Sequence, residues 1–129
     1  MPNKTVAADA SVNAAANEAA TQKKVPFAVA EAYKSIRTNL ISLLEKDGKK
    51  VIVISSPNVS EGKSTTSINT AISLSQLNKK VLLIDADAHR PSVHHKLKLD
   101  NSVGLMELIA GTAEPDNAIK HYNSSLDII

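Results

Sequence analysis

Side chains that could do chemistry gather in two short stretches of the 129-residue chain. The first, Gly62-Lys63-Ser64-Thr65, follows the branched apolar run "VIVI" at 51–54 and precedes a segment with helical spacing. The free backbone N–H groups of a first helical turn attract anions, and a lysine ammonium and two hydroxyls add charge and hydrogen bonds. We therefore predict a phosphate-binding loop, to which Ser60 and Glu61 also contribute.

The match to the pattern G-x-x-x-x-G-K-[ST] is partial, because Pro57 stands where the first glycine belongs. An alternative is a lysine-bearing helix start that Ser64 merely caps. The position between a buried strand and a helix favours the nucleotide interpretation. In that interpretation Lys63 contacts the β- and γ-phosphates of ATP, the Ser64 hydroxyl binds Mg²⁺, and Thr65 assists through its hydroxyl and backbone.

The second stretch, "VLLIDADAHRP", carries two aspartates at the carboxyl end of an apolar strand. Ligands of open α/β sheets bind at this edge, and Mg²⁺ prefers oxygen ligands. We therefore predict that Asp87 binds the metal and that Asp85 accepts the proton of an incoming hydroxyl. The alternative is that a strand-ending aspartate simply caps the next turn.

Apolar spacing predicts the elements that position these residues. An amphipathic helix runs from Val29 to Lys46 and ends at Asp47-Gly48. The other predicted elements are strands at 50–55 and 80–85, a helix at 64–76, a short segment at "SVHHKL", helices near "VGLMELIAG" and "EPDNAIKHY", and a third strand beginning at "SLDII". Strands that are apolar on successive residues are buried on both faces. The predicted fold is α/β, a P-loop NTPase with a parallel sheet in three α/β/α layers, incomplete.

Composition sets the broad class of the protein. With 43% hydrophobic and 22% charged residues, the chain is typical of a soluble globular protein. The net charge of +2 is scattered, which argues against nucleic acid as a partner, and the absence of cysteine excludes thiolate metal sites. Residues 1–25 show no sustained apolar stripe and are predicted to be a disordered leader to the domain at 26–129. No apolar run is long enough for a membrane span and no secretory signal is recognisable, so we expect a cytoplasmic protein.

The stretches "SSPNVSEGKSTTSIN" and "VLLIDADAHRP", preceded by "EAYKSIRTNL", resemble the bacterial tyrosine kinases (BY-kinases) of capsule and exopolysaccharide synthesis. The resemblance begins near Ala30 and implies a fold like that of the MinD and ParA ATPases. It implies an autophosphorylating protein-tyrosine kinase that uses ATP and Mg²⁺. It also implies protein tyrosine substrates, ring-forming subunits, and a membrane activator, the polysaccharide co-polymerase, that recruits the kinase to the inner face of the membrane.

By this resemblance, Lys63, Ser64 and Thr65 belong to the Walker A motif. Asp85 and Asp87 belong to the Walker A′ motif, D-x-D-x-R, whose aspartates serve catalysis and magnesium. His89 replaces the arginine of that motif, and a neutral imidazole cannot supply a permanent cation. No Walker B strand or tyrosine-rich tail precedes the end of the sequence. The chain therefore looks truncated, and we expect little kinase turnover from it alone.

The first predicted helix carries Glu31, Lys34 and Arg37 at three-residue steps, which by spacing alone is typical of a solvated charged face. The BY-kinases have E-x-x-R-x-x-R here, and the resemblance implies that these three residues join subunits into rings. Lys34 replaces the middle arginine and cannot form a bidentate fork to a carboxylate. We therefore expect weaker ring formation.

Two other functions fit the sequence. One is a MinD- or ParA-like switch ATPase, disfavoured because that class has lysine where this chain has Asn58. The other is a non-catalytic module that joins the rings of a full-length kinase through its first helix. A zinc site at His94-His95 is also disfavoured, because no further ligand lies at suitable spacing.

Overall fold

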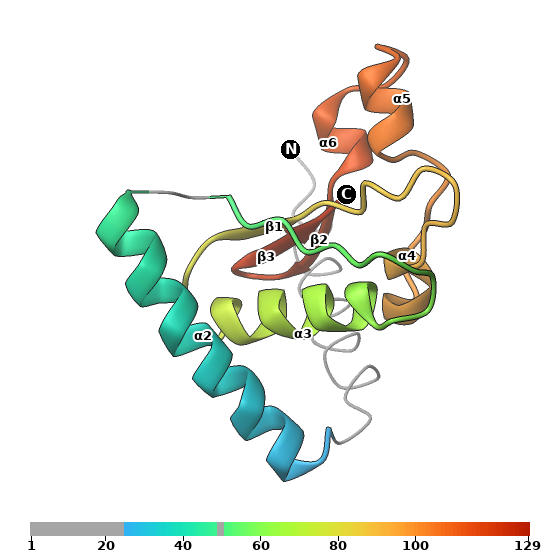
Figure 1. The fold of residues 1–129 in the computed structure, drawn as a ribbon. Coiled ribbons are helices and arrows are strands. Elements are labelled where there is room, and N and C mark those ends of the chain that lie inside the picture. Colours follow the sequence, from blue (N-terminus) through green and yellow to red (C-terminus); the bar gives the residue numbers. More distant parts are fainter. Residues whose placement is uncertain (1–24, 49–50) are drawn as a thin grey trace, which may run out of the picture.

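A computed structural model describes residues 25–48 and 51–129, so nearly all of the predicted leader at 1–25 lies outside the described residues. Figure 1 shows the arrangement of the described elements. The helices are α2 (Phe27–Asp47), α3 (Lys63–Ser75), α4 (Val93–Leu97), α5 (Leu105–Ile109) and α6 (Pro115–Ala118). The strands are β1 (Val81–Leu83), β2 (Lys120–Asn123) and β3 (Leu126–Ile128).

Helix α2 confirms the predicted first helix and packs against α3. It ends at Gly48, whose φ of 64° is left-handed, a conformation that favours glycine and stops a helix. The face of α2 that packs against the rest of the chain is narrower than the apolar stripe predicted from the sequence. Tyr33, Leu40 and Leu44 are half-buried, whereas Val29, Ile36 and Leu43 are exposed.

The three strands form one mixed sheet in the order β1-β3-β2. Strands β1 and β3 are parallel, with Val81 opposite Leu126 and Leu83 opposite Ile128. Strand β2 runs antiparallel to β3, so the prediction of a parallel sheet is wrong for this strand. The reason is local: only a short turn separates β2 from β3, and so short a connection can join only antiparallel neighbours. The predicted helix near "EPDNAIKHY" correspondingly ends at Ala118 and continues as β2.

The predicted strand at 50–55 is wrong for the described residues 51–55, which are assigned to no strand. Val51 and Val53 are 79% and 84% exposed. Figure 1 shows this green segment running from the end of α2 toward α3. An apolar run forms a buried strand only where both of its faces are covered, and no described element covers the exposed side of this one.

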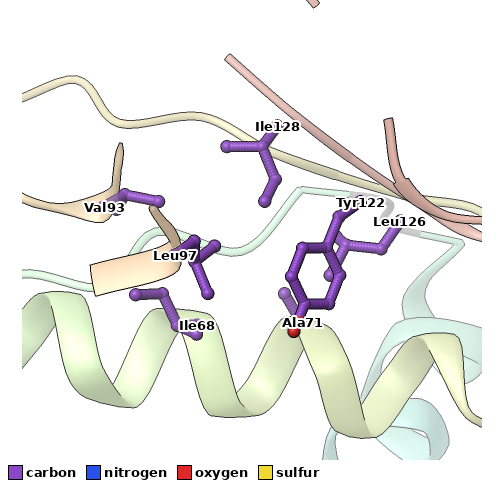
Figure 2. Close-up of a cluster of buried hydrophobic side chains, with 7 residues drawn as sticks. All are labelled: Ile68, Ala71, Val93, Leu97, Tyr122, Leu126 and Ile128. Atoms are coloured by element: carbon purple, nitrogen blue, oxygen red, sulfur yellow. The ribbon is translucent and has the colours of Figure 1, made fainter. Parts of the chain in front are cut away.

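A compact apolar core joins α3 and α4 to the sheet. Figure 2 shows its seven buried side chains, which are Ile68 and Ala71 of α3, Val93 and Leu97 of α4, Tyr122 of β2, and Leu126 and Ile128 of β3. The core positions the amino ends of α3 and α4 relative to the strands, because both helices bury their apolar side chains in it.

The opposite face of β1 is not covered in the described part of the chain. Side chains alternate along an extended chain, so Val81 and Leu83 pack against the core while Leu82, and Ile84 just past the end of β1, point away and are each 50% exposed. Figure 1 places α5 and α6 beyond one end of the sheet. The described residues therefore form helices on one face of a sheet, and the expected third layer is not seen. Within 25–48 and 51–129, none of the helices has both the length and the apolar character needed to cross a bilayer.

Candidate phosphate-binding site

The loop before α3 turns into the helix through two residues with positive φ. Gly62 is the N-cap of α3 and has a φ of 94°, in the left-handed region that glycine tolerates best. A Cβ added at Gly62 would meet no atom within 4 Å, so the requirement for glycine is conformational and not one of space. Ser60 also has a positive φ, of 64°, which the loop must hold in place by other contacts.

Glu61 supplies such contacts inside the loop. Its carboxylate accepts hydrogen bonds from the Asn58 side-chain amide at 2.8 Å and from the Asn58 backbone N–H at 3.2 Å. The bond from the Asn58 side chain is the larger cause that lowers the pKa of Glu61. Ser56 Oγ donates to the Asn58 carbonyl at 2.9 Å. In this structure Glu61 holds the loop, and its predicted contact with a nucleotide remains a prediction.

The first turn of α3 brings the two predicted motifs together. Lys63 and Ser64 are half-buried and Thr65 is exposed at the amino end of the helix, where the backbone N–H groups lack intrahelical acceptors. Lys63 Nζ lies 3.1 Å from Asp87 Oδ2. The Lys63 ammonium is the largest cause that lowers the pKa of Asp87, followed by the Arg90 backbone N–H. Asp87 therefore stays ionised beside the lysine.

Asp85 is placed differently from its neighbour. Its Oδ2 accepts the backbone N–H groups of Ser92 at 2.9 Å and Val93 at 3.0 Å, and its Oδ1 accepts that of Asp87 at 3.2 Å. The carboxylate thus closes the loop from β1 to α4 and satisfies two free N–H groups at the start of α4. These contacts correspond to the capping alternative for a strand-ending aspartate. The three bonds use three of the roughly four lone-pair positions of the carboxylate, so one position on Oδ1 is left for a proton.

Comparison with known proteins identifies the family of the region that contains this site. Residues 49–129, more than half of the chain, match the family model described as AAA domain. The chain belongs to this family. The matched AAA domain contains both the Lys63 turn and the Asp85–Asp87 loop, whereas helix α2 precedes it.

Relatives of this chain include bacterial proteins named tyrosine-protein kinases. Tyrosine-protein kinase YwqD of Bacillus subtilis is 39% identical over 100 residues, which cover 77% of this chain and 42% of YwqD. Tyrosine-protein kinase etk of Escherichia coli is 29% identical over 116 residues, covering 83% of this chain and 16% of etk. The crystal structure of the VpsO kinase domain superposes with a TM-score of 0.63 at 29% identity, over 81% of this chain and 55% of that one.

These comparisons confirm the resemblance to the bacterial tyrosine kinases. The chain spans less than half the length of YwqD and about half of the VpsO kinase domain. The AAA domain departs from the Walker A′ pattern at His89, and both His89 and Arg90 are exposed. Arg90 contributes its backbone N–H to Asp87 Oδ1 at 3.0 Å.

The three residues of α2 that are predicted to join subunits separate into two kinds. Glu31 and Lys34 form an exposed ion pair at 2.7 Å. Arg37 is half-buried and donates from Nη1 to the Ser73 carbonyl of α3 at 2.9 Å, while Ser73 Oγ donates back to the Tyr33 carbonyl at 3.3 Å. Arg37 therefore ties α2 to α3 within the chain, which spacing alone could not reveal.

The donor set around Lys63 fits a magnesium nucleotide. No cluster of three or more His, Cys, Asp or Glu that could hold a metal occurs in the described ranges. Mg²⁺ needs no such cluster, because it keeps several waters and binds through one or two carboxylates together with the phosphates. The Ser64 hydroxyl and the ionised Asp87 carboxylate are oxygen ligands of this kind, and the start of α3 offers N–H groups to the phosphates.

Sequence reasoning missed one side chain at this site. Ser92 Oγ donates a hydrogen bond to Ser64 Oγ at 2.7 Å, across the gap between the first turns of α4 and α3. The only signal in the sequence is a serine at the start of the "SVHHKL" segment, which is typical of an ordinary helix cap.

Proposed function

We propose that this chain is the nucleotide-binding part of an ATP-dependent, autophosphorylating protein-tyrosine kinase. The single observation that carries the proposal is the 3.1 Å contact between Lys63 and Asp87, because it joins a Walker A turn to a Walker A′ aspartate at one helix end. Relatives named tyrosine-protein kinases support it. The role in capsular or exopolysaccharide biosynthesis, and a membrane-bound activator that recruits the kinase to the inner membrane face, rest on the family resemblance.

Each proposed site residue has a distinct task. Lys63 compensates phosphate charge, and the loop at Ser60–Gly62 with the α3 backbone surrounds the phosphates. Ser64 and Asp87 would hold Mg²⁺, which would neutralise charge on the phosphates of ATP, the donor of the transferred phosphoryl group. If Lys63 pairs with a phosphate instead of with Asp87, the Asp87 carboxylate is available to bind Mg²⁺. Thr65 lies in the same helical turn and supports the phosphates through its hydroxyl and N–H.

The proposed catalytic residues are Lys63, Asp85 and Asp87. A tyrosine hydroxyl that attacks a phosphoryl group must lose its proton, and a carboxylate is the natural acceptor. The three N–H bonds to Asp85 make it foremost the residue that fixes Asp87 and α4 in place. Proton transfer to Asp85 would be a second task of the same carboxylate.

The uncovered face of β1 supports a further part of the proposal. Leu82 and Ile84 are each half-exposed, and such a strand is normally covered on both sides in α/β folds. We propose that the complete kinase domain has the three α/β/α layers expected from the sequence. The VpsO kinase domain, of which this chain matches 55%, has further residues beyond the matched part.

Radiolabelled ATP tests the proposed function. We expect this chain to bind Mg·ATP, and a chimera extended with the second half of YwqD to transfer γ-phosphate to tyrosine in itself and in an added peptide. Phosphate release without phosphotyrosine would favour a MinD- or ParA-like switch ATPase. Nucleotide binding with neither product would favour a non-catalytic module. Absence of Mg·ATP binding would overturn the phosphate-loop interpretation altogether.

Self-association into rings, which we propose for Glu31, Lys34 and Arg37, makes a separate prediction. Because Arg37 already ties α2 to α3, its removal would disturb the fold, so Glu31→Ala is the cleaner variant. We expect Glu31→Ala to shift assemblies toward monomer in light scattering at high concentration. Glu45→Ala is the matched control, since Glu45 lies on the same helix in an exposed ion pair with Lys79 at 3.4 Å. Equal masses for both variants, or a monomeric wild type, would contradict the proposal.

A further inference from the structure

Ser92 occupies a helix cap but does not use its hydroxyl as one. It is the N-cap of α4, where a serine oxygen normally accepts an N–H from two or three residues further on. No side-chain cap bond is made by Ser92. Asp85 Oδ2 instead accepts the N–H groups of Ser92 and Val93, at 2.9 and 3.0 Å. Asp85 thus holds the first two N–H groups at the start of α4, and the Ser92 hydroxyl, which makes no cap bond, bonds elsewhere.

That hydroxyl bonds to the proposed metal ligand. Ser92 Oγ donates to Ser64 Oγ at 2.7 Å, a normal distance for an O–H···O bond, and both residues are half-buried. A hydroxyl carries one hydrogen and two acceptor lone pairs. With one lone pair engaged by Ser92, the Ser64 oxygen keeps a second lone pair for a cation, and its rotation about the Cβ–Oγ bond is restricted.

We infer that Ser92 is a positioning residue that orients the Ser64 hydroxyl toward the divalent cation of a bound nucleotide. The inference rests on the proposed function, since it names the outer partner of a ligand in that site. Outer partners of metal ligands fix ligand orientation, and their loss typically lowers metal affinity by about 10- to 100-fold. Ser92 is itself held by Asp85, so a chain of hydrogen bonds runs from Asp85 through Ser92 to Ser64.

Fluorescence of mant-ADP tests this inference without relying on phosphate transfer. The whole chain is first titrated with mant-ADP in EDTA, which gives the affinity without metal. The titration is then repeated at increasing Mg²⁺ concentrations, and the Mg²⁺ concentration that gives half of the metal-dependent increase in affinity is the Mg²⁺ midpoint. For Ser92→Ala we expect that Mg²⁺ concentration to rise about tenfold. The affinity in EDTA should stay unchanged, because Ser92 contacts no group that binds phosphate in this proposal. Ser92→Thr, which keeps the hydroxyl, should restore the wild-type Mg²⁺ response.

Two controls separate positioning from folding. Ser67→Ala removes a hydroxyl of the same size one turn into α3, where Ser67 Oγ donates to the Lys63 carbonyl at 2.8 Å, and should leave the Mg²⁺ midpoint unchanged. Ser92→Gly removes the hydroxyl while keeping a favourable N-cap residue, and serves if Ser92→Ala lowers the melting temperature.

The possible failures are distinguishable. A wild type that binds mant-ADP in neither condition overturns the proposed function and this inference together. A wild type that responds to Mg²⁺, with an unchanged midpoint in Ser92→Ala, overturns the inference alone. Equal losses in Ser92→Ala and Ser92→Thr, or a loss of the same size in EDTA, would assign the effect to packing and also overturn it.

Discussion

Replacing Lys63 with methionine should lower the affinity for Mg·ATP by about 10- to 100-fold, because a hydrogen bond to a charged group contributes about 1.5–3 kcal/mol. Methionine keeps much of the length of the side chain but leaves the phosphate charge uncompensated at the start of α3. Isothermal titration calorimetry with Mg·ATP measures the loss. An affinity within twofold of wild type would remove the phosphate-loop interpretation.

Lys79→Met is the matched control for this prediction. Lys79 lies past the carboxyl end of α3, whereas the loop and Lys63 lie at its amino end. The Lys79 side chain is about half-exposed and pairs with Glu45 at 3.4 Å. It changes the net charge by the same amount as Lys63→Met. Mg·ATP affinity should therefore be unchanged in Lys79→Met, and an equal loss in both variants would point to general electrostatics.

The same lysine variant should change the titration of Asp87. Lys63 lowers the pKa of Asp87 in the folded chain, so the pair stabilises the fold above the unfolded pKa and loses this effect as the pH falls through the lowered value. Without Lys63 the pKa of Asp87 should rise toward its ordinary range, which an NMR titration of the carboxyl carbon would detect. Both partners are partly exposed, so the contribution to stability is small.

Leu126→Ala should be the most destabilising single truncation in the core, with a loss of about 2–5 kcal/mol in the free energy of unfolding. Leu126 is 0% exposed and lies on β3, the central strand, between β1 and β2. Alanine keeps the backbone hydrogen bonds of the strand, so the loss reports packing alone. Domains of this size are stable by only about 5–15 kcal/mol, so much of that margin would be lost.

Urea unfolding followed by far-UV circular dichroism measures this loss. Leu77→Ala is the control, because Leu77 lies just past the end of α3 and is 47% exposed. Its truncation should change the free energy of unfolding by less than about 1 kcal/mol. If the two variants unfolded at the same urea concentration, β3 would not be the centre of the core.

The sequence predicts the helices better than it predicts the sheet. Helical spacing and the left-handed stop at Gly48 are local, and so is the turn into α3 at Gly62, which explains why these elements are where we expected them. The expectation that Asp87 lies near the Lys63 turn rested on the rule that ligands of open α/β sheets bind at the carboxyl edge, and the two side chains meet although 51–55 forms no strand.

The errors come from features that depend on neighbours. The apolar run at 51–54 has the composition of a buried strand, but strand formation requires a partner and cover that composition does not report. The spacing of the "KHY" segment predicts a helix, but so short a window fits the helical and the strand period equally well. The bond from the Ser92 N–H to Asp85 and the bond from the Ser92 hydroxyl to Ser64 join the start of α4 to other segments of the chain. Residue spacing along the sequence cannot predict such contacts.

The uncovered face of β1 bears on how cooperatively the chain unfolds. Leu82 and Ile84 already meet water in the folded state, and Val51 and Val53 do so even more. Unfolding therefore exposes less new apolar surface than in a domain covered on both sides. Since the heat-capacity change and the denaturant slope both scale with newly exposed surface, both should be small for a chain of this length. The stability curve is then shallow, and the urea transition is broad.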